Sequence, residues 1–405
     1  MQPKLSVGNL YKIFGKDPAR ALELLRAGKG KAEILDRLGA TVGVRDVSFD
    51  VGEGEIFVVM GLSGSGKSTL VRMLNGLIRP TSGHVRIDGQ DITAADAAGL
   101  RRIRREKIAM VFQHFALFPH WTIAENVAYG LKVRGIPAEK RRAHALSVLA
   151  QVGLEPWADS MPSELSGGMQ QRVGLARGLA ADPDILLMDE PFGALDPLIR
   201  RDMQTELLDL QKTLRKTIVF ITNDLNEAIL LGNRIAIMKD GGVVQIGTPQ
   251  EIVANPADDY VAAFVADIDR GRVFTADDVA SEPRTVQLRD TSVREALRLL
   301  EECGSQALYV MEGERIVGIA TYRDLASSEL AGGSATVGDA VITDYPSTGA
   351  DTRINALYGP AGSGLPIAVT DGNDRLVGMI QQDDLWSHLS GSPEDAKEAA
   401  DVQPR

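Results

Sequence analysis

Short apolar runs that end in glycines, amides or carboxylates recur along the first two thirds of the chain. They are predicted to be buried strands, and they span residues 55–60, 108–112, 184–190 and 217–222. Apolar residues at helical spacing separate them and predict helices over 18–38, from 70 to 77, and over 124–133 and 139–152. The chain therefore alternates strands and helices, and polar residues gather where strands end.

The loop after the first of these strands fits the phosphate-binding pattern G-x-x-x-x-G-K-[ST]. Its glycines allow consecutive backbone N–H groups to turn toward an anion, at a helix N-terminus whose dipole favours negative charge. Lys67 is expected to contact the β- and γ-phosphates of a bound nucleotide, and the Ser68 hydroxyl is expected to bind Mg²⁺. A Gly/Ser-rich turn without a ligand is the alternative, which the flanking strand and helix disfavour. The predicted nucleotide-binding residues are Gly61, Ser63, Gly64, Ser65, Gly66, Lys67, Ser68 and Thr69.

Two later strands end in residues that suit the same chemistry. Gln113 follows the strand 108–112 and could hold Mg²⁺ or the attacking water, although the signal is weak by itself. Asp189 is predicted to bind Mg²⁺, usually through water, and Glu190 to polarise the hydrolytic water. Adjacent acids could also open an ordinary loop, but here they lie downstream of a phosphate loop.

A second glycine-rich segment, Leu165–Arg172, opens another helix. The backbone amides and hydroxyl of Ser166, Gly167 and Gly168 form a second candidate anion site at that helix N-terminus. One chain with two phosphate-binding segments suggests that each completes the other across a dimer.

Composition limits the class of protein. A chain of 405 residues with 44% apolar positions predicts two or three domains with real cores. No apolar run approaches the roughly eighteen residues of a membrane span, and the start lacks a secretory signal, so a cytosolic protein, soluble or peripheral, is expected. Five scattered histidines show no ligand spacing, and the single cysteine, Cys303, is predicted to be a small core residue of a helix.

The net charge of −11 is unevenly distributed. Residues 273–390 contain 18 Asp and Glu against 8 Arg and Lys, a balance of −10, so the remainder is close to neutral. No basic domain is present, which argues against a nucleic-acid partner. The basic run Arg101–Lys107 is predicted to be a solvated helix face.

Taken in order, these motifs resemble the ATPase subunit of an ABC transporter, over roughly residues 5–260. The motifs are Gly61–Ser68, Gln113, Leu165–Gln170, Ile185–Glu190 and Ala194–Asp196. The resemblance implies an α/β fold: a P-loop, RecA-like ATPase domain over 1–265 with a helical subdomain at about 115–175.

The same resemblance implies a head-to-tail homodimer. ATP would lie between the phosphate loop of one chain and Ser166–Gly168 of the other, with Asp196 also at the nucleotide. Phe14, or Tyr11 as second choice, would stack on adenine. The segment Phe115–Trp121, which is either core or a docking surface, would receive a helix of a transmembrane permease.

Three stretches narrow the resemblance to the ATPases of glycine betaine/proline importers, a branch that takes up osmoprotectants. They are the insertion between Phe14 and Val44, the run Met60–Lys67, and Ala109–Gln113. This branch implies a peripheral protein at the cytoplasmic face of the membrane, linked through the permease to a periplasmic or extracellular substrate-binding protein. A soluble ABC ATPase that acts on ribosomes or DNA is the alternative, but it would usually carry two cassettes or a long coiled-coil insertion.

Asn223 departs from the family pattern, which places a histidine at this position, in contact with the γ-phosphate and the attacking water. An amide donates a hydrogen bond but cannot carry positive charge or relay a proton. We therefore expect Asn223 to sense the γ-phosphate, with ATP binding retained and hydrolysis slowed. A nucleotide-gated regulator that hardly hydrolyses ATP remains an alternative.

The last third contains an internal repeat. With a shift of sixty residues, Arg315–Gly318 falls on Arg375–Gly378, and Arg323–Leu325 on Asp383–Leu385. Each copy is predicted to fold as strand, helix, strand, turn, strand, helix, although Gly359–Gly364 interrupts the first helix of the second copy.

The repeat resembles a tandem pair of CBS domains, an α+β regulatory module, at about 273–330 and 335–390. Residues at the family's adenosine site correspond to Thr321 and Asp324 in one copy and Gln381 and Asp384 in the other. A salt-sensing or dimerising module without a ligand is the alternative. The tail 391–405 is predicted to be disordered.

Overall fold

The structure is a computed structural model that describes residues 2–113, 115–330 and 336–390. The chain divides into two compact units, the first ending at Ala266 and the second beginning at Asp267. The tail 391–405, predicted to be disordered, lies outside the described residues. No helix within the described ranges combines the length and apolar character that a membrane crossing needs.

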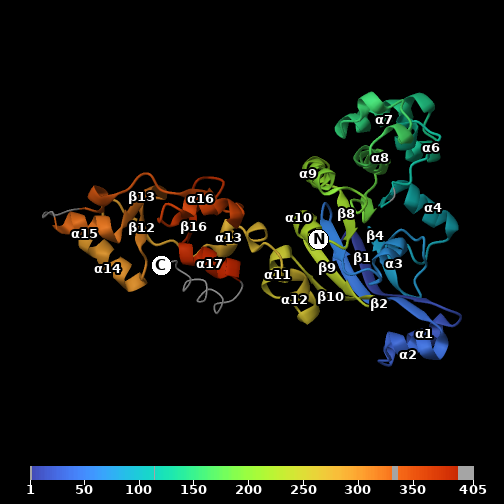
Figure 1. Ribbon diagram of the computed structural model, residues 1–405, viewed down its shortest axis with the longest axis horizontal. Helices are drawn as coiled ribbons and strands as arrows, with labels where there is room; N and C mark the ends of the chain where they lie inside the picture. The colour runs from blue at the N-terminus through green and yellow to red at the C-terminus, as the bar shows by residue number, and fades with distance from the viewer. Residues whose placement is uncertain (1, 114, 331–335, 391–405) are drawn as a thin grey trace. The chain divides into compact units, whose positions relative to one another are not determined.

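A six-stranded sheet forms the centre of the first unit, in the order β10-β9-β3-β8-β7-β6. Figure 1 labels β8, β9 and β10 of this sheet. All neighbours pair in parallel except β9 and β10. Every residue of β3 and β8 is buried, as in parallel sheets covered on both faces. The strands are β3 (Ile56–Met60), β6 (Ile108–Phe112), β7 (Ile185–Asp189), β8 (Thr217–Thr222), β9 (Arg234–Lys239) and β10 (Gly242–Gly247).

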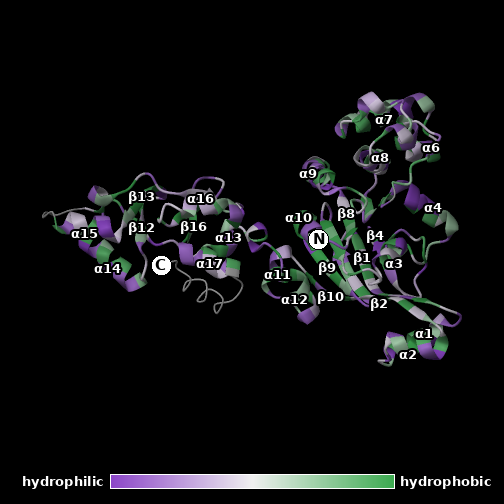
Figure 2. Ribbon diagram, viewed as in Figure 1, coloured by the Kyte–Doolittle hydropathy of each residue, from purple (hydrophilic) through white to green (hydrophobic). Residues whose placement is uncertain are grey.

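A second, antiparallel sheet of the first unit has the order β2-β1-β4-β5. Phe49 of β2 and Phe57 of β3 stack at 4.7 Å, and one hydrophobic cluster joins both sheets with helices α3 and α4. Figure 2 shows the strands as mostly hydrophobic, while α4 is mostly hydrophilic. The bounds are β1 (Leu5–Phe14), β2 (Thr41–Val51), β4 (Ser82–Ile87), β5 (Gln90–Asp91), α3 (Lys67–Leu74) and α4 (Ala97–Glu106). Helix α3 begins at Lys67 rather than Leu70, because Gly66 at φ +106° turns the chain directly into the helix.

Figure 1 shows α6, α7 and α8 apart from the sheets, and with α5 they make up a helical group that has its own hydrophobic core. They are α5 (Ile123–Val127), α6 (Tyr129–Val133), α7 (Ala138–Gln151) and α8 (Gly167–Ala180). The side chain of the buried Asn126 fixes the loop before α5, since it accepts from the Phe118 N–H at 2.7 Å and donates to three loop carbonyls.

The insertion after β1 forms two helices, which pack on the start of the first unit in a small cluster of their own. These are α1 (Pro18–Arg26) and α2 (Lys31–Leu38). The remaining helices of this unit are α9 (Pro197–Leu214), α10 (Leu225–Leu231), α11 (Pro249–Ala254) and α12 (Asp259–Val265).

The second unit contains two three-stranded sheets of the same topology, β11-β12-β13 and β14-β15-β16. In the first copy the elements are α13 (Ala276–Val279), β11 (Thr285–Gln287), α14 (Val293–Cys303), β12 (Ala307–Glu312), β13 (Arg315–Thr321) and α15 (Tyr322–Leu330). In the second they are η4 (Val337–Ala340), β14 (Ser347–Gly349), η5 (Ile354–Leu357), α16 (Tyr358–Ala361), β15 (Ile367–Thr370), β16 (Leu376–Ile380) and α17 (Gln382–Ser390). As the glycine-rich segment predicts, two helices of four residues each, η5 and α16, replace the eleven-residue helix α14 in the second copy.

The two copies share a core. Tyr309 of β12 is fully buried, and its hydroxyl donates to the Pro366 carbonyl at 3.1 Å. Gly318 packs so closely on the second copy that an added Cβ would lie 2.4 Å from the Ile342 carbonyl oxygen. One prediction is wrong: Cys303 is exposed, because it is the last residue of α14, whose buried face is Val293, Ala296 and Leu300.

Candidate functional site

The phosphate loop connects β3 to α3, and three of its glycines have positive φ: Gly61 at +153°, Gly64 at +81° and Gly66 at +106°. An added Cβ would lie 2.3 Å from the Met238 carbonyl at Gly61 and 2.3 Å from the Gly43 carbonyl at Gly66. Positions 61 and 66 therefore require glycine for two reasons: their φ angles are positive, and no space is left for a Cβ atom. The loop thus takes the turn that its sequence predicts.

Lys67 is only 4% exposed and points back into the loop. Its ammonium donates to the carbonyls of Gly61 at 2.7 Å and Leu62 at 3.1 Å, and to Asn223 Oδ1 at 2.6 Å. Burial lowers the pKa of Lys67, and the neighbouring carboxylate of Glu190 opposes that shift. The three bonds use the full donor capacity of the ammonium.

Both predicted carboxylates stand at the end of β7. Asp189 accepts from the Ser68 hydroxyl at 3.4 Å, and Glu190 accepts from Asn223 Nδ2 at 2.7 Å. Burial and the adjacent Glu190 raise the pKa of Asp189. Glu190 has φ +47°, a strained conformation for a side chain of this size. Lys67, Asn223 and Glu190 therefore form one row, with the amide bridging cation and anion.

Gln113 joins this group because β6 and β7 run side by side, with Phe112 opposite Asp189. The amide nitrogen of Gln113 would lie 3.3 Å from a Cβ atom added to Gly193. Gln113, Glu190 and Asn223 also line one cavity of about 450 Å³. The hydroxyl of Ser68 and the side-chain oxygens of Asp189 and Gln113 are the hard donors that Mg²⁺ prefers, so the residues present fit the metal.

The two aromatic candidates for the adenine contact differ in exposure. Tyr11 is 9% exposed and belongs to the cluster under α1 and α2, whereas Phe14 is 41% exposed. An added Cβ on Gly43 would lie 2.9 Å from the Phe14 ring and 3.4 Å from the Thr69 methyl group. Phe14 therefore lies beside the phosphate loop with part of its ring exposed, although Lys12 Nζ lies 5.0 Å from the ring centroid, and this exposure favours it over Tyr11.

The second glycine-rich segment opens α8. Ser166 caps this helix by accepting from the Met169 N–H at 3.4 Å, and Ser166 and Gly167 are exposed. Gly168 is buried against α9, where an added Cβ would lie 2.5 Å from the Ile199 Cγ2 atom.

Asp196 caps α9 and accepts from the N–H groups of Leu198 and Ile199, both at 3.1 Å. It therefore fixes the turn at the start of that helix. Its predicted contact with a nucleotide stays a prediction.

Comparison with known proteins accounts for both units. Residues 44–193 match the ABC transporter family and residues 277–330 the CBS domain family. The glycine betaine/carnitine transport ATP-binding protein of Listeria monocytogenes is 48% identical over 96% of this chain and 98% of its own length. The glycine betaine/proline betaine transport system ATP-binding protein of Escherichia coli is 50% identical over 94% of this chain and 96% of its length. The chain belongs to the ATP-binding proteins of ABC transporters.

Solved structures agree with this assignment. The dimeric post-hydrolysis state of the ATP-binding cassette MJ0796, bound to ADP and Pi, has a TM-score of 0.51 and 35% identity, covering 60% of this chain and 98% of that one. The structure of CbiO1 from Clostridium perfringens, part of the ABC transporter complex CbiONQ, has a TM-score of 0.53 and 26% identity, covering 64% of this chain and 93% of that one. The predicted ATPase fold and the CBS resemblance are confirmed.

Three further residues of this ABC ATPase, Thr222, Glu227 and Arg200, line the same cavity as Gln113, Glu190 and Asn223 and were not predicted from sequence. Thr222 ends β8 directly before Asn223, and its hydroxyl donates to the buried Glu227 at 2.6 Å. Arg200 of α9 approaches the same carboxylate at 3.9 Å. The available signal was a lone acid in the mostly apolar segment Leu225–Leu231.

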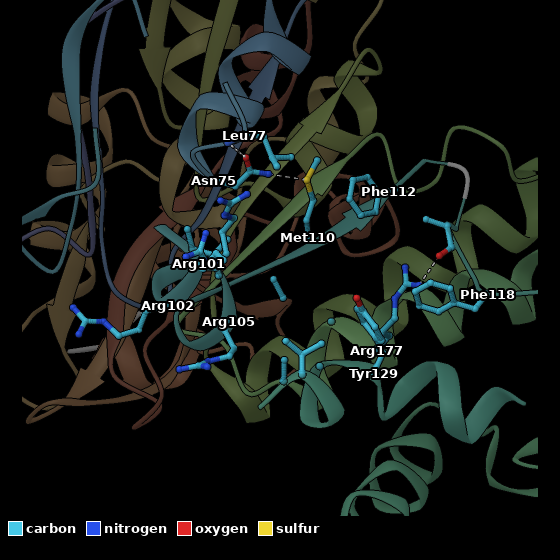
Figure 3. Close-up of a pocket in the computed structure, with 18 of the residues that line it drawn as sticks. Asn75, Leu77, Arg101, Arg102, Arg105, Met110, Phe112, Phe118, Tyr129 and Arg177 are labelled. Atoms are coloured by element: carbon cyan, nitrogen blue, oxygen red, sulfur yellow. Dashed lines mark hydrogen bonds between the residues drawn. The ribbon is translucent and has the colours of Figure 1, made fainter. Parts of the chain in front are cut away.

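A larger cavity of about 720 Å³ lies between α4, β6 and the helical group of the ATPase (Figure 3). Figure 3 shows Arg101, Arg102 and Arg105 along one side, so the basic run is a cavity wall as well as a solvated face. Phe118 and Tyr129 line the helical side, with ring centroids 4.8 Å apart.

Two side chains of the aromatic segment 115–121 have different surroundings. Leu117 packs on the core of the helical group, while Phe118 faces the cavity. Arg177 of α8 donates to the Phe115 and Ala116 carbonyls at 2.8 and 2.6 Å and so holds this segment.

In the second unit, which contains the CBS match, the candidate ligand residues cap helices. Thr321 and Asp324 bond to each other at the start of α15, and the Gln381 N–H donates to Asp384 at 2.9 Å at the start of α17. Both aspartates are therefore engaged in local turns.

Proposed function

We propose that the chain is the ATP-hydrolysing subunit of an ABC importer for glycine betaine or proline-type osmoprotectants, with a CBS pair that regulates it. The observation that carries this proposal is that similarity of 48–50% identity to betaine-transport ATP-binding proteins extends through both units. Similarity limited to the ATPase unit would support ATP hydrolysis, but it would not indicate which class of molecule is transported.

The residues of the site suit Mg-ATP hydrolysis. The loop amides and Lys67 bind the phosphates, and Phe14 stacks on the base. Ser68, Asp189 and Gln113 would hold Mg²⁺, which when bound neutralises charge on the phosphates. Glu190 orients and polarises the attacking water, and Asn223 donates a hydrogen bond beside it.

Two chains are proposed to close around ATP head to tail. The exposed N-terminus of α8, with Ser166 and Gly167, offers backbone donors to a phosphate held by the loop of the other chain. Asp196 holds the adjacent turn in place. The dimeric arrangement of the solved ATP-binding cassettes supports this proposal.

The cavity beside α4 is the proposed dock for the permease. An apolar floor with an aromatic wall accepts a short amphipathic helix, the common mode of helix-in-groove recognition. Permease binding would hold the subunit at the cytoplasmic face of the membrane, and a substrate-binding protein would act through the permease alone.

The acidic CBS pair is proposed as the regulatory module. Its net charge of −10 would be screened over about 8 to 10 Å at physiological ionic strength, so its contacts depend on salt. A nucleotide at Thr321 and Asp324 is the competing proposal.

Uptake of radiolabelled glycine betaine by cells tests the function. Deleting the gene should abolish uptake after osmotic upshift, the native gene should restore it, and a Lys67→Ala version should not. Full uptake in the deletion strain, or restoration by Lys67→Ala, would contradict the proposal.

A second function, a nucleotide-gated regulator with little turnover, is favoured by Asn223 alone. A single-turnover assay separates the two proposals. Conversion of bound ATP to ADP on the time scale of transport supports an importer, and ATP that stays intact supports the regulator.

A further inference from the structure

The side chain of Glu227 is a buried acid that the proposed mechanism leaves without a role. It is 5% exposed on α10, among Leu225, Ala228 and Ile229. Burial raises the pKa of its carboxyl, since the charged form is poorly solvated there. Burying an apolar side chain at this position would cost less free energy, so the contacts of the carboxyl group must account for its presence.

Those contacts lead to the catalytic region. Glu227 accepts from the Thr222 hydroxyl at 2.6 Å and from Gln204 Nε2 at 3.0 Å, and Arg200 Nε lies 3.9 Å away. Thr222 is the last residue of β8, paired with Met60, the residue before the phosphate loop. The carboxylate therefore anchors the end of the strand that delivers Asn223.

The Thr222 hydroxyl, which belongs to the residue before Asn223, makes hydrogen bonds to two residues that follow Asn223. While it donates to Glu227, it accepts from the Asp224 N–H at 3.0 Å. This closes a tight local turn of the kind that Ser and Thr side chains form with the amide two residues on. The backbone of Asn223 is thereby fixed at the point where its side chain must leave the strand.

The orientation of the Asn223 amide matters because its two ends face opposite charges. Its oxygen accepts from Lys67 at 2.6 Å and its nitrogen donates to Glu190 at 2.7 Å. A reversed or displaced amide would set N–H against the ammonium and oxygen against the carboxylate. Its placement is thus sensitive to the turn that holds it.

We propose that Glu227 is a positioning residue for ATP hydrolysis: through the Thr222 hydroxyl it holds Asn223 between Lys67 and Glu190. Arg200, which also donates to the Leu195 carbonyl at 3.2 Å, connects the turn before α9 to the same carboxylate. This inference rests on the proposed role of Asn223 in hydrolysis.

The test is a set of double-mutant cycles on the full chain, with kcat and the KM for ATP as readouts. Thr222→Val removes the hydroxyl at nearly constant shape, Glu227→Gln removes the charge, and Thr222→Ser keeps the hydroxyl as the conservative control. In the native background the first two should lower kcat about tenfold and leave KM within about twofold, whereas Thr222→Ser stays near the native rate. In an Asn223→Ala background neither should lower kcat further, because the positioned side chain is gone.

Equal losses in both backgrounds would show a general structural role and overturn the inference, as would native rates for Thr222→Val and Glu227→Gln. The proposed role of Asn223 fails separately, if Asn223→Ala itself hydrolyses ATP at the native rate. Binding of a fluorescent ATP analogue by each variant verifies that the site has folded, and Glu227→Gln provides the answer if Thr222→Val does not fold.

Discussion

Asn223 joins a cation and an anion with a single neutral side chain. In this structure the Asn223 amide accepts a hydrogen bond from Lys67 and donates one to Glu190. No ionisable group is therefore needed between the ammonium and the carboxylate. A histidine could bridge the same pair, and could in addition take up a proton near neutral pH. The consequence of the amide should therefore appear in the rate of hydrolysis and in its pH dependence.

We predict that Asn223→His raises ATP turnover by about tenfold to a thousandfold, the range for gaining one transition-state contact. The rate of that variant should fall as pH decreases through an imidazole pKa of ~6.5, because a protonated ring can no longer accept a hydrogen bond from Lys67, and the native chain lacks this step. Steady-state ATPase rates between pH 5.5 and 8.5, taken as about one measurement per half unit, check both effects. Equal rates and equal pH profiles would mean that the position is unimportant here.

At the level of helices, α8 and α9 meet where Gly168 lies against Ile199. The Cβ of an alanine would collide with Cγ2, an atom of a β-branched side chain that has little freedom to move. Gly167, one residue earlier, has open space around its Cβ position. The two glycines therefore offer a matched pair of substitutions.

Gly168→Ala is expected to destabilise the chain by about 1–3 kcal/mol through overpacking. Gly167→Ala is expected to be neutral or to stabilise by up to about 0.5–1 kcal/mol, because alanine loses less backbone entropy in a helix. Urea denaturation of both variants measures the difference. If the two substitutions had the same effect on the free energy of unfolding, the close approach of α8 and α9 would be refuted.

Arg177 connects α8 to the segment that borders the cavity beside α4. Phe115 and Ala116 both have positive φ, at +51° and +50°, a conformation that costs free energy for residues other than glycine. Two charge-assisted bonds from the guanidinium to their carbonyls offset that cost. This pair of bonds, the Arg177 clamp, thus holds the segment 115–118, one wall of the cavity, to the helix that begins at Gly167.

Arg177→Lys should release this wall, since an ammonium cannot bond both carbonyls in the fork geometry of a guanidinium. We expect amide hydrogen exchange in residues 115–118 to accelerate about tenfold, from the loss of one charged hydrogen bond of about 1.5 kcal/mol. Arg172→Lys, on the same helix, is the control. Unchanged protection of 115–118 would argue against the clamp.

Local patterns predicted the parts of this site that are contiguous in sequence. The phosphate loop, Asp189, Glu190 and Gln113 each follow a buried strand, and parallel strands bring their carboxyl ends to one edge. The inward-pointing Lys67 and its bond to Asn223 were not predictable, because they join residues 156 positions apart. Glu227 was missed for a similar reason: a lone acid in an apolar helix shows its role only through its partner on β8.

Across the whole molecule, the charge excess lies in the second unit and the ATPase site in the first. The account predicts that KCl changes the ATPase rate of the full chain through the acidic module. A chain ending before residue 273 should lose most of that salt response, because the charges being screened are gone. ATPase titrations with KCl on both chains measure it, and identical responses would show that the CBS pair is not the sensor.

In the proposed dimer two chains share two nucleotides, each between the phosphate loop of one chain and the N-terminus of α8 of the other. Sedimentation of the Glu190→Gln chain, in which hydrolysis is blocked, tests this most directly. With Mg-ATP the mass should double from 43.5 kDa, and with ADP, or in a Lys67→Ala, Glu190→Gln double variant, it should not. A Glu190→Gln chain that binds Mg-ATP and stays monomeric would contradict the account.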